Sequence, residues 1–259
     1  MISYIITTYN KQNTIALCLD QLSDFELGHE VVVYDDGSED KTRDILTSYQ
    51  KKGNFKIIFG RRIGRAKALN EAIKASSNQI IAINDADDIS AKNRTEFILS
   101  KLEAFNKYSI QGTDIVITYD LPTQNDIDIL NIKCSRFKDI SSETYDIGQL
   151  YLGNKYSHST LFFEKDLWRE LNGYDESLDI CIDYDFILRS SQLSPTIKYN
   201  YPLVLQYTDY DSYFRKKSNY EYSKALKKVR SKINVNYSTK ASLQYLTLKY
   251  RLRNLLKSF

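Results

Sequence analysis

Three carboxylates are crowded into four consecutive positions of the chain. Asp85, Asp87 and Asp88 end an apolar run in the sequence "IIAINDADDIS". Carboxylates this close disfavour one another's ionisation, so the cluster needs a metal cation, a Lys or Arg, or the N-terminus of a helix. Mg²⁺ and Mn²⁺ prefer oxygen ligands and keep coordination positions for water and substrate phosphates. We therefore predict a divalent metal site, with Asp87 as the direct ligand and Asp85 on the nucleotide or acting through water.

The alternative to a metal site is an ordinary acidic turn. Acidic turns are common, and Asp88 could cap a following helix while Asp85 and Asp87 face water.

Two other apolar runs also end in polar residues, "TTYN" at 7–10 and "DDGS" at 35–38. Because the carboxyl ends of parallel strands meet at one edge of a sheet, where ligands bind, we expect the three segments to form one site.

The elements that must position these side chains are strands alternating with helices. Apolar runs predict strands at residues 2–7, 30–36, 55–60, 79–84 and 114–119. Amphipathic segments predict helices at 15–22, at 38–50 with Ser38 as N-cap, at 64–76, and around Ile98, Leu102 and Phe105. This alternation indicates an α/β fold, with a Rossmann-like, mostly parallel central sheet flanked by helices. Residues 120–150 show no clear period.

The composition is that of a globular protein. Of the 259 residues, 42% are hydrophobic and 27% are charged. The three cysteines are an odd number without metal-type spacing, which suits a reducing cytoplasm better than a disulfide framework. The chain shows no basic-then-apolar leader and no apolar run of about 18 residues, so we expect neither a signal peptide nor a membrane span. We also expect no nucleic-acid partner.

The net charge of +3 hides an asymmetry between the body and the C-terminal tail. From residue 213 onward there are 13 Lys and Arg against one acid, whereas the first 212 residues carry 23 bases and 32 acids. A helical wheel gives the tail an apolar face formed by Tyr245, Leu248, Leu252, Leu255, Leu256 and Phe259, with Lys249, Arg253 and Lys257 beside it. Such a basic amphipathic helix fits an anionic membrane surface. The alternative is that this face packs on the body or on a partner subunit.

Four segments of the chain resemble the inverting glycosyltransferases of family 2, which have the nucleotide-sugar-binding GT-A fold. They are "YIITTYNKQNTIALCLDQL", "EVVVYDDGSEDKT", "GRAKALNEAIKASSNQIIAINDADD" and "NGYDESLDICIDYDFILR", in family order and spacing. The resemblance is strong over 1 to about 110, moderate over 155–192 and absent in the tail. It implies a GT-A domain at 1–212, with a nucleotide-sugar half at 1–110 and an acceptor half at 111–212, followed by a basic helical tail at 213–259.

The resemblance places the donor site residue by residue. Thr8, Tyr9 and Asn10 match the segment that lines the nucleotide base and ribose. Asp36 matches the carboxylate that accepts the N3–H of uracil or thymine, a role that suits an acceptor-only group; the alternative is a turn residue before a glycine. Three further residues match a segment that approaches the donor: Gly64, Arg65 and Asn70. Arg65 could pair with the diphosphate, or it could be a solvated helix start.

The resemblance also places the acceptor side. An inverting transfer needs a carboxylate that takes the proton of the acceptor hydroxyl, and Asp183 matches it. Members of the family usually have Glu-Asp at this position, whereas this chain has Ile182 before Asp183. Asp185 is a second candidate, although it could simply pair with Arg189 at i, i+4. Acceptor-side candidates are Tyr174, Asp175, Glu176 and Asp185. His158 is a weak candidate for the diphosphate or metal, and a core role is the alternative.

These features predict a metal-dependent inverting glycosyltransferase of hexosyl or N-acetylhexosaminyl type. It would use Mn²⁺ or Mg²⁺ and a UDP-sugar to extend a bacterial surface polysaccharide such as a capsule or O-antigen. The acceptor could be lipid-linked, which would place the enzyme in the cytoplasm or on the cytoplasmic face of the inner membrane. A sugar nucleotidyltransferase would need a Gly-rich basic loop after the first strand, and "TTYNKQNT" has none. A glycosyltransferase-like binding protein without catalysis is left open by Ile182.

Overall fold

Five apolar runs form strands close to where the sequence predicts them. They are β1 (Ile2–Thr8), β2 (Glu30–Asp35), β3 (Phe55–Phe59), β4 (Ile80–Ile83) and β6 (Gln111–Thr118). The structure is a computed structural model that describes residues 1–23, 28–102, 107–135, 137, 139–208, 216–236 and 238–245.

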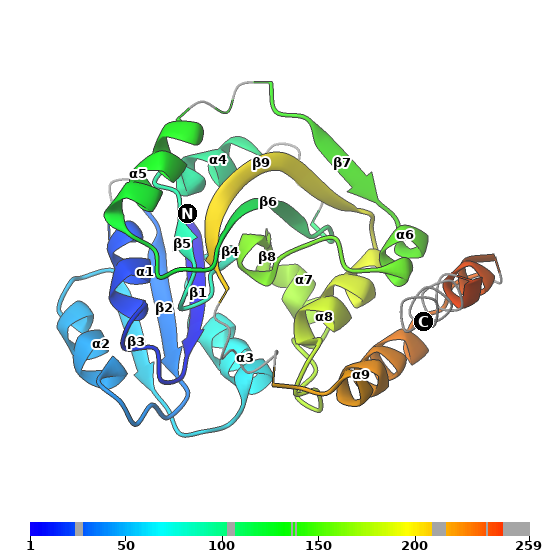
Figure 1. Ribbon diagram of the computed structural model, residues 1–259, viewed down its shortest axis with the longest axis horizontal. Helices are drawn as coiled ribbons and strands as arrows, with labels where there is room; N and C mark the ends of the chain where they lie inside the picture. Colours follow the sequence, from blue (N-terminus) through cyan, green and yellow to red (C-terminus); the bar gives the residue numbers. More distant parts are fainter. Residues whose placement is uncertain are drawn as a thin grey trace, which may run out of the picture.

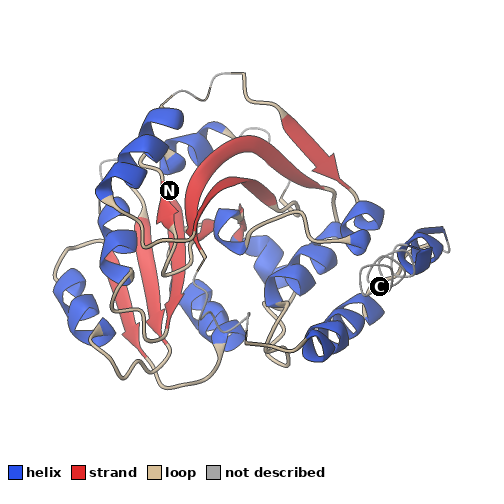
Figure 2. Cartoon of the chain, in the orientation of Figure 1, coloured by secondary structure: helices blue, strands red, loops and turns tan. Residues whose placement is uncertain are grey.

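The strands form one sheet in the order β3-β2-β1-β4-β8-β6-β9-β5, with β7 paired to β9 (Figure 1; Figure 2). The pairs β3–β2, β2–β1, β1–β4 and β6–β9 are parallel. Strand β8 (Phe162–Glu164) lies antiparallel between β4 and β6, and the two short strands β5 (Ile89–Ser90) and β7 (Ser142–Tyr145) run antiparallel to the long curved β9 (Thr196–Tyr207). The predicted α/β fold with a mostly parallel sheet is confirmed.

Helices cover both faces of the sheet. One face packs against α1 (Ile15–Gln21), α2 (Thr42–Gln50), α4 (Arg94–Ser100) and α5 (Gln124–Lys133), and the other against α3 (Arg65–Ala75), α7 (Lys165–Glu170) and α8 (Ile182–Ser191). Successive side chains of β1 enter opposite cores, Tyr4 and Ile6 on the first face and Ile5 on the second. Burial on both faces explains why these parallel strands are continuously apolar in sequence.

Two predicted helix boundaries differ from the structure. Helix α2 begins at Thr42 rather than after Ser38, because the hydroxyl of Ser38 accepts the backbone N–H of Asn10 at 2.9 Å and so joins the turns after β1 and β2. Helix α4 ends at Ser100; the partly buried Leu102 packs against the same core, and Phe105 lies outside the described residues.

The stretch 120–150, which has no clear period, contains α5, β7 and α6 (Ile147–Leu152). Its elements are short, so the hydrophobic pattern is weak. A signal was nonetheless present, because both helices begin with a capping box. Thr123 and Asp126 bracket the start of α5, and Asp146 and Gln149 bracket the start of α6.

The first helix of the basic tail, α9 (Asn219–Ser231), packs on the body beside α8 (Figure 1). Val229 is fully buried in the core on that face of the sheet. The ammonium group of Lys232 contacts the carboxylates of Asp175 and Asp185, the latter at 2.5 Å. This part of the tail therefore docks on the acidic body.

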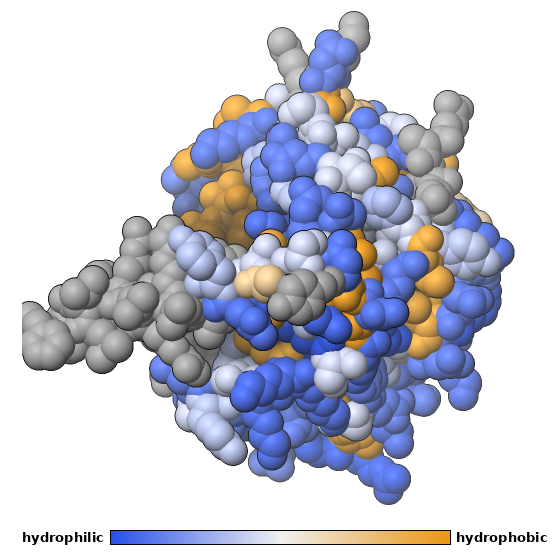
Figure 3. All heavy atoms as spheres, turned by 90° about the vertical axis from the view of Figure 1, so that its right-hand side faces the viewer, coloured by the Kyte–Doolittle hydropathy of each residue, from blue (hydrophilic) through white to orange (hydrophobic). Residues whose placement is uncertain are grey.

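The role of the apolar face predicted at the end of the tail stays a prediction. Tyr245 is 65% exposed, and residues 246–259 lie outside the described residues. The surface toward the viewer in Figure 3 is mainly hydrophilic, with hydrophobic residues in separate patches. Within the described ranges, no helix combines the length and the apolar character needed to span a bilayer.

Replacing Lys232 by Met should lower stability. Asp185 is fully buried, and loss of one of its two cationic partners leaves its charge poorly compensated. We expect a loss of roughly 1–3 kcal/mol, the range for a hydrogen bond to a charged group, and thus a Tm lower by several degrees. Differential scanning calorimetry measures it, with Lys224→Met, an exposed lysine of α9, as the control. Equal Tm values for the two variants would contradict the docking role of Lys232.

Candidate active site

A buried arginine fixes the acidic turn that follows β4. Arg94, on α4, is 1% exposed. Its Nη2 donates to the carbonyl of Ile83 at 2.9 Å, and its Nη1 donates to Oδ1 of Asn84 at 3.0 Å and to the hydroxyl of Ser90 at 2.8 Å. The amide of Asn84 in turn donates to the carbonyl of Asp88 at 3.0 Å. Sequence reasoning missed Arg94, because nothing in its local pattern separates it from a solvated helical arginine.

Two carboxylates of the turn form ion pairs, and the third is buried. Asp85 pairs with Arg65 at 2.5 Å, and Asp87 pairs with Lys11 at 2.6 Å. Burial works to raise the pKa of Asp85, but Arg65 outweighs it and holds that pKa below its ordinary value. Burial raises the pKa of Asp88 well above its ordinary value, and the charges of Asp85 and Asp87 add to the shift. The turn thus places two carboxylates that pair with cations beside a buried carboxyl whose pKa is raised.

Asp88 has a structural role that differs from capping a helix. It is 1% exposed, accepts the hydroxyl of Ser159, and accepts the backbone N–H of Tyr207 at 3.1 Å. The residues that follow it form β5, and α4 has Asn93 as its N-cap. The capping alternative is therefore wrong. Asp88 instead joins the acidic turn to the end of β9.

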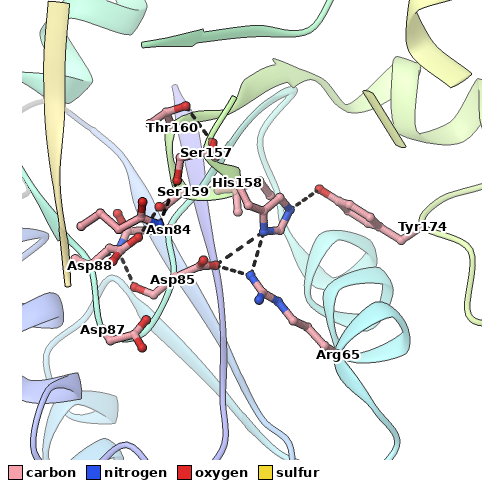
Figure 4. A network of polar contacts seen from close by, with 12 residues as sticks. Arg65, Asn84, Asp85, Asp87, Asp88, Ser157, His158, Ser159, Thr160 and Tyr174 are labelled. Carbon is pink, nitrogen blue, oxygen red and sulfur yellow. Dashed lines mark hydrogen bonds and ion pairs between the residues drawn. The ribbon is translucent and has the colours of Figure 1, made fainter. Parts of the chain in front are cut away.

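A chain of polar contacts runs from Asp85 across the site (Figure 4). Nη2 of Arg65 lies 2.9 Å from Nδ1 of His158, and Nε2 of His158 lies 3.0 Å from the hydroxyl of Tyr174. Nδ1 of His158 also lies 3.5 Å from Oδ1 of Asp85, so the ring contacts both members of the Arg65–Asp85 pair. Arg65 opens α3 directly after Gly64, whose φ of +89° favours glycine.

The strand ends border a cavity of about 770 Å³, called here the larger cavity. Its polar walls come from the segments after β1, β2 and β4, as the sequence predicts. The side chain of Thr8 is buried there, and its hydroxyl has no hydrogen-bond partner within the described part of the chain. The residues relevant to the site that line this cavity are Thr8, Tyr9, Lys11, Asp36, Arg62, Gly64, Arg65, Asp85, Asp87, Glu176 and Gln206.

Asp36 is almost fully buried and holds the loop that leads into α3. Its Oδ1 accepts the backbone N–H of Ile63 at 2.7 Å, and its Oδ2 accepts from Arg62 at 2.6 Å. The guanidinium of Arg62 also lies 3.7 Å from the centre of the Tyr9 ring. Arg62 therefore bridges two residues predicted to contact the base. Sequence reasoning missed it, although "GRRIGR" is an evident basic signal.

Two of the predicted donor residues lie outside the larger cavity. The side chain of Asn10 accepts the backbone N–H of Glu39 at 2.8 Å, at the turn before α2. The amide of Asn70 binds both α7 and the loop that follows it, because its Oδ1 accepts the indole N–H of Trp168 at 3.0 Å. Its Oδ1 accepts the backbone N–H of Tyr174 at 2.8 Å, its Nδ2 donates to Glu176 at 3.1 Å, and a Cβ on Gly173 would lie 2.6 Å from its Oδ1. Asn70 therefore fastens this loop to α3.

A smaller cavity of about 490 Å³ holds Asp183. The two cavities share Arg65, Asp85 and Gln206, so they meet at the acidic turn. Asp183 sits in the first turn of α8, and its carboxylate accepts from the amide of Asn154 at 3.1 Å. The predicted base and the predicted metal ligands are thus brought to opposite sides of one junction.

None of the four acceptor-side candidates lines the smaller cavity. Tyr174 is 1% exposed and turned to His158, and Glu176 lines the larger cavity. Asp185 is buried between Arg189, at 2.7 Å, and Lys232, which also contacts Asp175. The pairing of Asp185 with Arg189 confirms the alternative stated for it. Residues of the smaller cavity that sequence reasoning missed include Asn154, Lys155, Gln206 and Tyr222.

The donor set limits how a metal could be held. In the described residues, no group of three or more His, Cys, Asp or Glu is arranged to hold an ion. A cation at this turn would therefore have Asp87, with or without Asp85, as its protein ligands, and would need oxygens from a ligand or water. Mg²⁺ and Mn²⁺ accept such a shell. Lys11 and Arg65 are the cations that these carboxylates contact in this structure.

The family profile described as "Glycosyl transferase family 2" matches residues 3–169. A poly(ribitol-phosphate) beta-glucosyltransferase from Bacillus spizizenii is 28% identical over 150 residues, which is 51% of this chain and 23% of that protein. The chain thus spans about a quarter of the length of that relative.

Solved structures share the fold. S. aureus TarS 1–349 in complex with UDP-GlcNAc superposes with a TM-score of 0.67 at 18% identity, covering 93% of this chain and 70% of that one. The mannosyltransferase PcManGT from Pyrobaculum calidifontis, in complex with GDP-Man and Mn²⁺, gives 0.60 at 15% identity, covering 99% and 84%. These likenesses confirm the predicted GT-A architecture.

Replacing Asp88 by Asn should stabilise the protein at neutral pH. A carboxyl whose folded pKa is raised binds its proton more tightly in the folded state, so its contribution is lost as pH rises above the unfolded value. The variant lacks this loss. The free energy of unfolding of the variant should equal that of wild type near pH 4. Above that pH the difference in favour of the variant should grow by at most about 1.4 kcal/mol per pH unit until the pKa of Asp88 in the folded state is reached.

Urea unfolding of both proteins in EDTA, between pH 4 and 8, measures this difference. Asp179→Asn, at an exposed carboxylate on the rim of the larger cavity, is the control. A stability difference between wild type and Asp88→Asn that does not change with pH would contradict the raised pKa.

Proposed function

Because the chain belongs to glycosyl transferase family 2, we propose that it transfers a sugar, with inversion, from a nucleotide diphosphate sugar to a hydroxyl group of a glycan. The observation that supports this most directly is the meeting of the two cavities at Arg65 and Asp85. The larger one is lined by the basic and acidic groups suited to a diphosphate, and the smaller one by Asp183.

This arrangement suits a single displacement. Inversion requires the acceptor oxygen to attack the anomeric carbon from the side opposite the leaving diphosphate, so the base and the diphosphate site must face one another. Asp183 would take the proton of the acceptor hydroxyl. Arg65 and Lys11 would donate to the diphosphate from the other cavity. The binding-only alternative, left open by Ile182, shares this geometry and is separated from transfer by the Asp183→Asn experiment below.

The acidic turn is the proposed metal site. Asp87, with Asp85, would hold Mn²⁺ or Mg²⁺, and the bound ion would stabilise negative charge on the departing diphosphate. Lys11 must then leave Asp87 or share it, and its flexible side chain lets it follow the phosphates. The Mn²⁺ complex of a structural neighbour is in keeping with this proposal.

A UDP-sugar of hexosyl or N-acetylhexosaminyl type is the proposed donor. Oδ1 of Asp36 accepts one backbone bond, which leaves a second lone pair for the N3–H of a uracil. The unpartnered hydroxyl of Thr8 and the ring of Tyr9 offer further contacts to base and ribose. The neighbours include complexes with UDP-GlcNAc and with GDP-Man, so a screen of UDP-, GDP- and dTDP-sugars for donor hydrolysis is the direct test.

The proposed acceptor is a bacterial surface glycan, such as a capsule or O-antigen precursor, presented on a lipid carrier. The glucosyltransferase relative, named for poly(ribitol-phosphate), supports an acceptor of the cell surface. We place the reaction at the cytoplasmic face of the inner membrane, with the basic residues of the tail beyond α9 as the contact with anionic lipid.

Asp183→Asn should abolish turnover and spare donor binding. Removal of a general base is expected to lower kcat by about 10²-fold or more, while the larger cavity is untouched. Release of UDP from the donor found in the screen measures turnover, and calorimetric titration with UDP measures binding. Asp185→Asn is the comparison, because it should lower Tm through its buried ion pairs. An active Asp183→Asn and a folded but inactive Asp185→Asn would mean that the base is misassigned.

Asp87→Asn should abolish the dependence of UDP binding on metal. The amide keeps the shape of the side chain but removes the charge that a divalent cation requires. Isothermal titration with UDP, in Mn²⁺ and in EDTA, gives the comparison. Asp179→Asn removes an exposed charge from the same cavity and should behave as wild type. A Mn²⁺-dependent UDP affinity retained in Asp87→Asn would exclude this carboxylate as the ligand.

A further inference from the structure

The tail contributes a side chain to the smaller cavity. Tyr222, on α9, lines it together with Asp183, Asn154 and Lys155. We propose that α9 completes the acceptor site and that Tyr222 contacts the acceptor sugar beside Asp183. This inference rests on the function proposed above and goes beyond it, because it assigns a substrate contact to a part of the chain that lies outside both the family profile and the resemblance.

Tyr222 has the exposure and the protonation state of a ligand-contacting phenol. It is 43% exposed, and it lines the smaller cavity together with Asp183 and with Cys181, the N-cap residue of α8. Burial raises the pKa of Tyr222 to about 12, and the charges of Cys181 and Asp183 add to the shift. The phenol is therefore neutral at physiological pH, and part of its surface is exposed in the cavity.

The helix that presents Tyr222 is firmly placed at its far end. Lys232 contacts two carboxylates of the body, and Lys228 donates to the carbonyl of Ser177 at 2.9 Å. Arg230 donates through Nε to the carbonyl of Tyr151 at 2.9 Å, at the end of α6. With Val229 buried in the core, these bonds fix α9 against α6 and α8. Such support is what a binding side chain needs to keep its position.

A half-exposed tyrosine next to a general base suits a sugar. The face of the ring can cover the C–H surface of a pyranose, and the hydroxyl adds a polar end. Asn154 and Lys155 supply hydrogen-bond donors to the same cavity. Tyr156 lines this cavity as well, and most of the other lining residues are polar or charged, which suits a ligand rich in hydroxyl groups. Tyr220, two positions earlier, is 77% exposed and lines neither cavity, so it offers a matched control.

Saturation-transfer NMR on the full chain tests the contact. The probes are methyl β-D-glucopyranoside and methyl N-acetyl-β-D-glucosaminide, in saturating UDP and Mn²⁺. Wild type, Tyr222→Phe and Tyr220→Ala should transfer saturation to at least one glycoside. Tyr222→Ala should reduce that signal at least about fivefold, the scale for truncating an aromatic contact. Lys232→Met should reduce it as well if docking of α9 positions the ring.

UDP affinity, measured by calorimetry in the same samples, separates this inference from the function on which it rests. Retained UDP binding with a signal lost only in Tyr222→Ala and Lys232→Met supports the proposal. An unchanged signal in Tyr222→Ala overturns it, and so does a wild type that binds UDP but transfers no saturation to either glycoside. Failure of every protein to bind UDP would instead count against the proposed donor, whatever the glycosides show.

Discussion

The placement of three carboxylates on one turn is the constraint around which this structure is built. Repulsion among them would open the turn if it were left uncompensated. Arg65 and Lys11 neutralise two of them from the ligand side, and the third is buried and favours its protonated form. Arg94 fixes the backbone of the turn from below, through bonds to a carbonyl, an amide and a hydroxyl. Charge therefore gathers at a rim that could bind a cation and a diphosphate.

Polar side chains of α3 and α8 connect the acidic turn to the segment that contains Asp183. Arg65 begins α3, and Asn70, further along this helix, binds α7 and the loop after it through its amide. That loop is bonded in turn to α8, because Arg189 donates to the carbonyl of Gly173 at 2.8 Å. The geometry between the acidic turn and Asp183 is thus set by side chains that contact neither cavity. Their loss would disturb the site without removing any group from it.

The uneven distribution of charge is a second organising feature. An acidic body and a basic tail attract one another, and part of that attraction is realised where Lys232 meets Asp175 and Asp185. The contact buries one carboxylate completely, so it needs two cations and would be costly to break. The first helix of the tail thereby also contributes Tyr222 to the wall of the smaller cavity.

The sequence by itself determined the α/β fold, the five apolar strands predicted from it, and the gathering of "TTYN", "DDGS" and "DADD" at one rim. It could do so because burial on both faces leaves a continuous apolar run, and because parallel strands share the edge at which they end. It also identified Asp183 as a candidate base, through the resemblance of the surrounding segment.

Only the tertiary structure decided which polar residues face a cavity and which connect elements of the fold. Asp183 and Asp185 are two positions apart on one helix, yet one is open to the smaller cavity and the other is buried between two cations. Arg62, Arg94 and Tyr222 had no pattern of their own that marked their partners. Each of them contacts residues that are about 25 or more positions away in the sequence or that belong to another element. Such pairings arise from packing rather than from the local periodicity that a sequence displays.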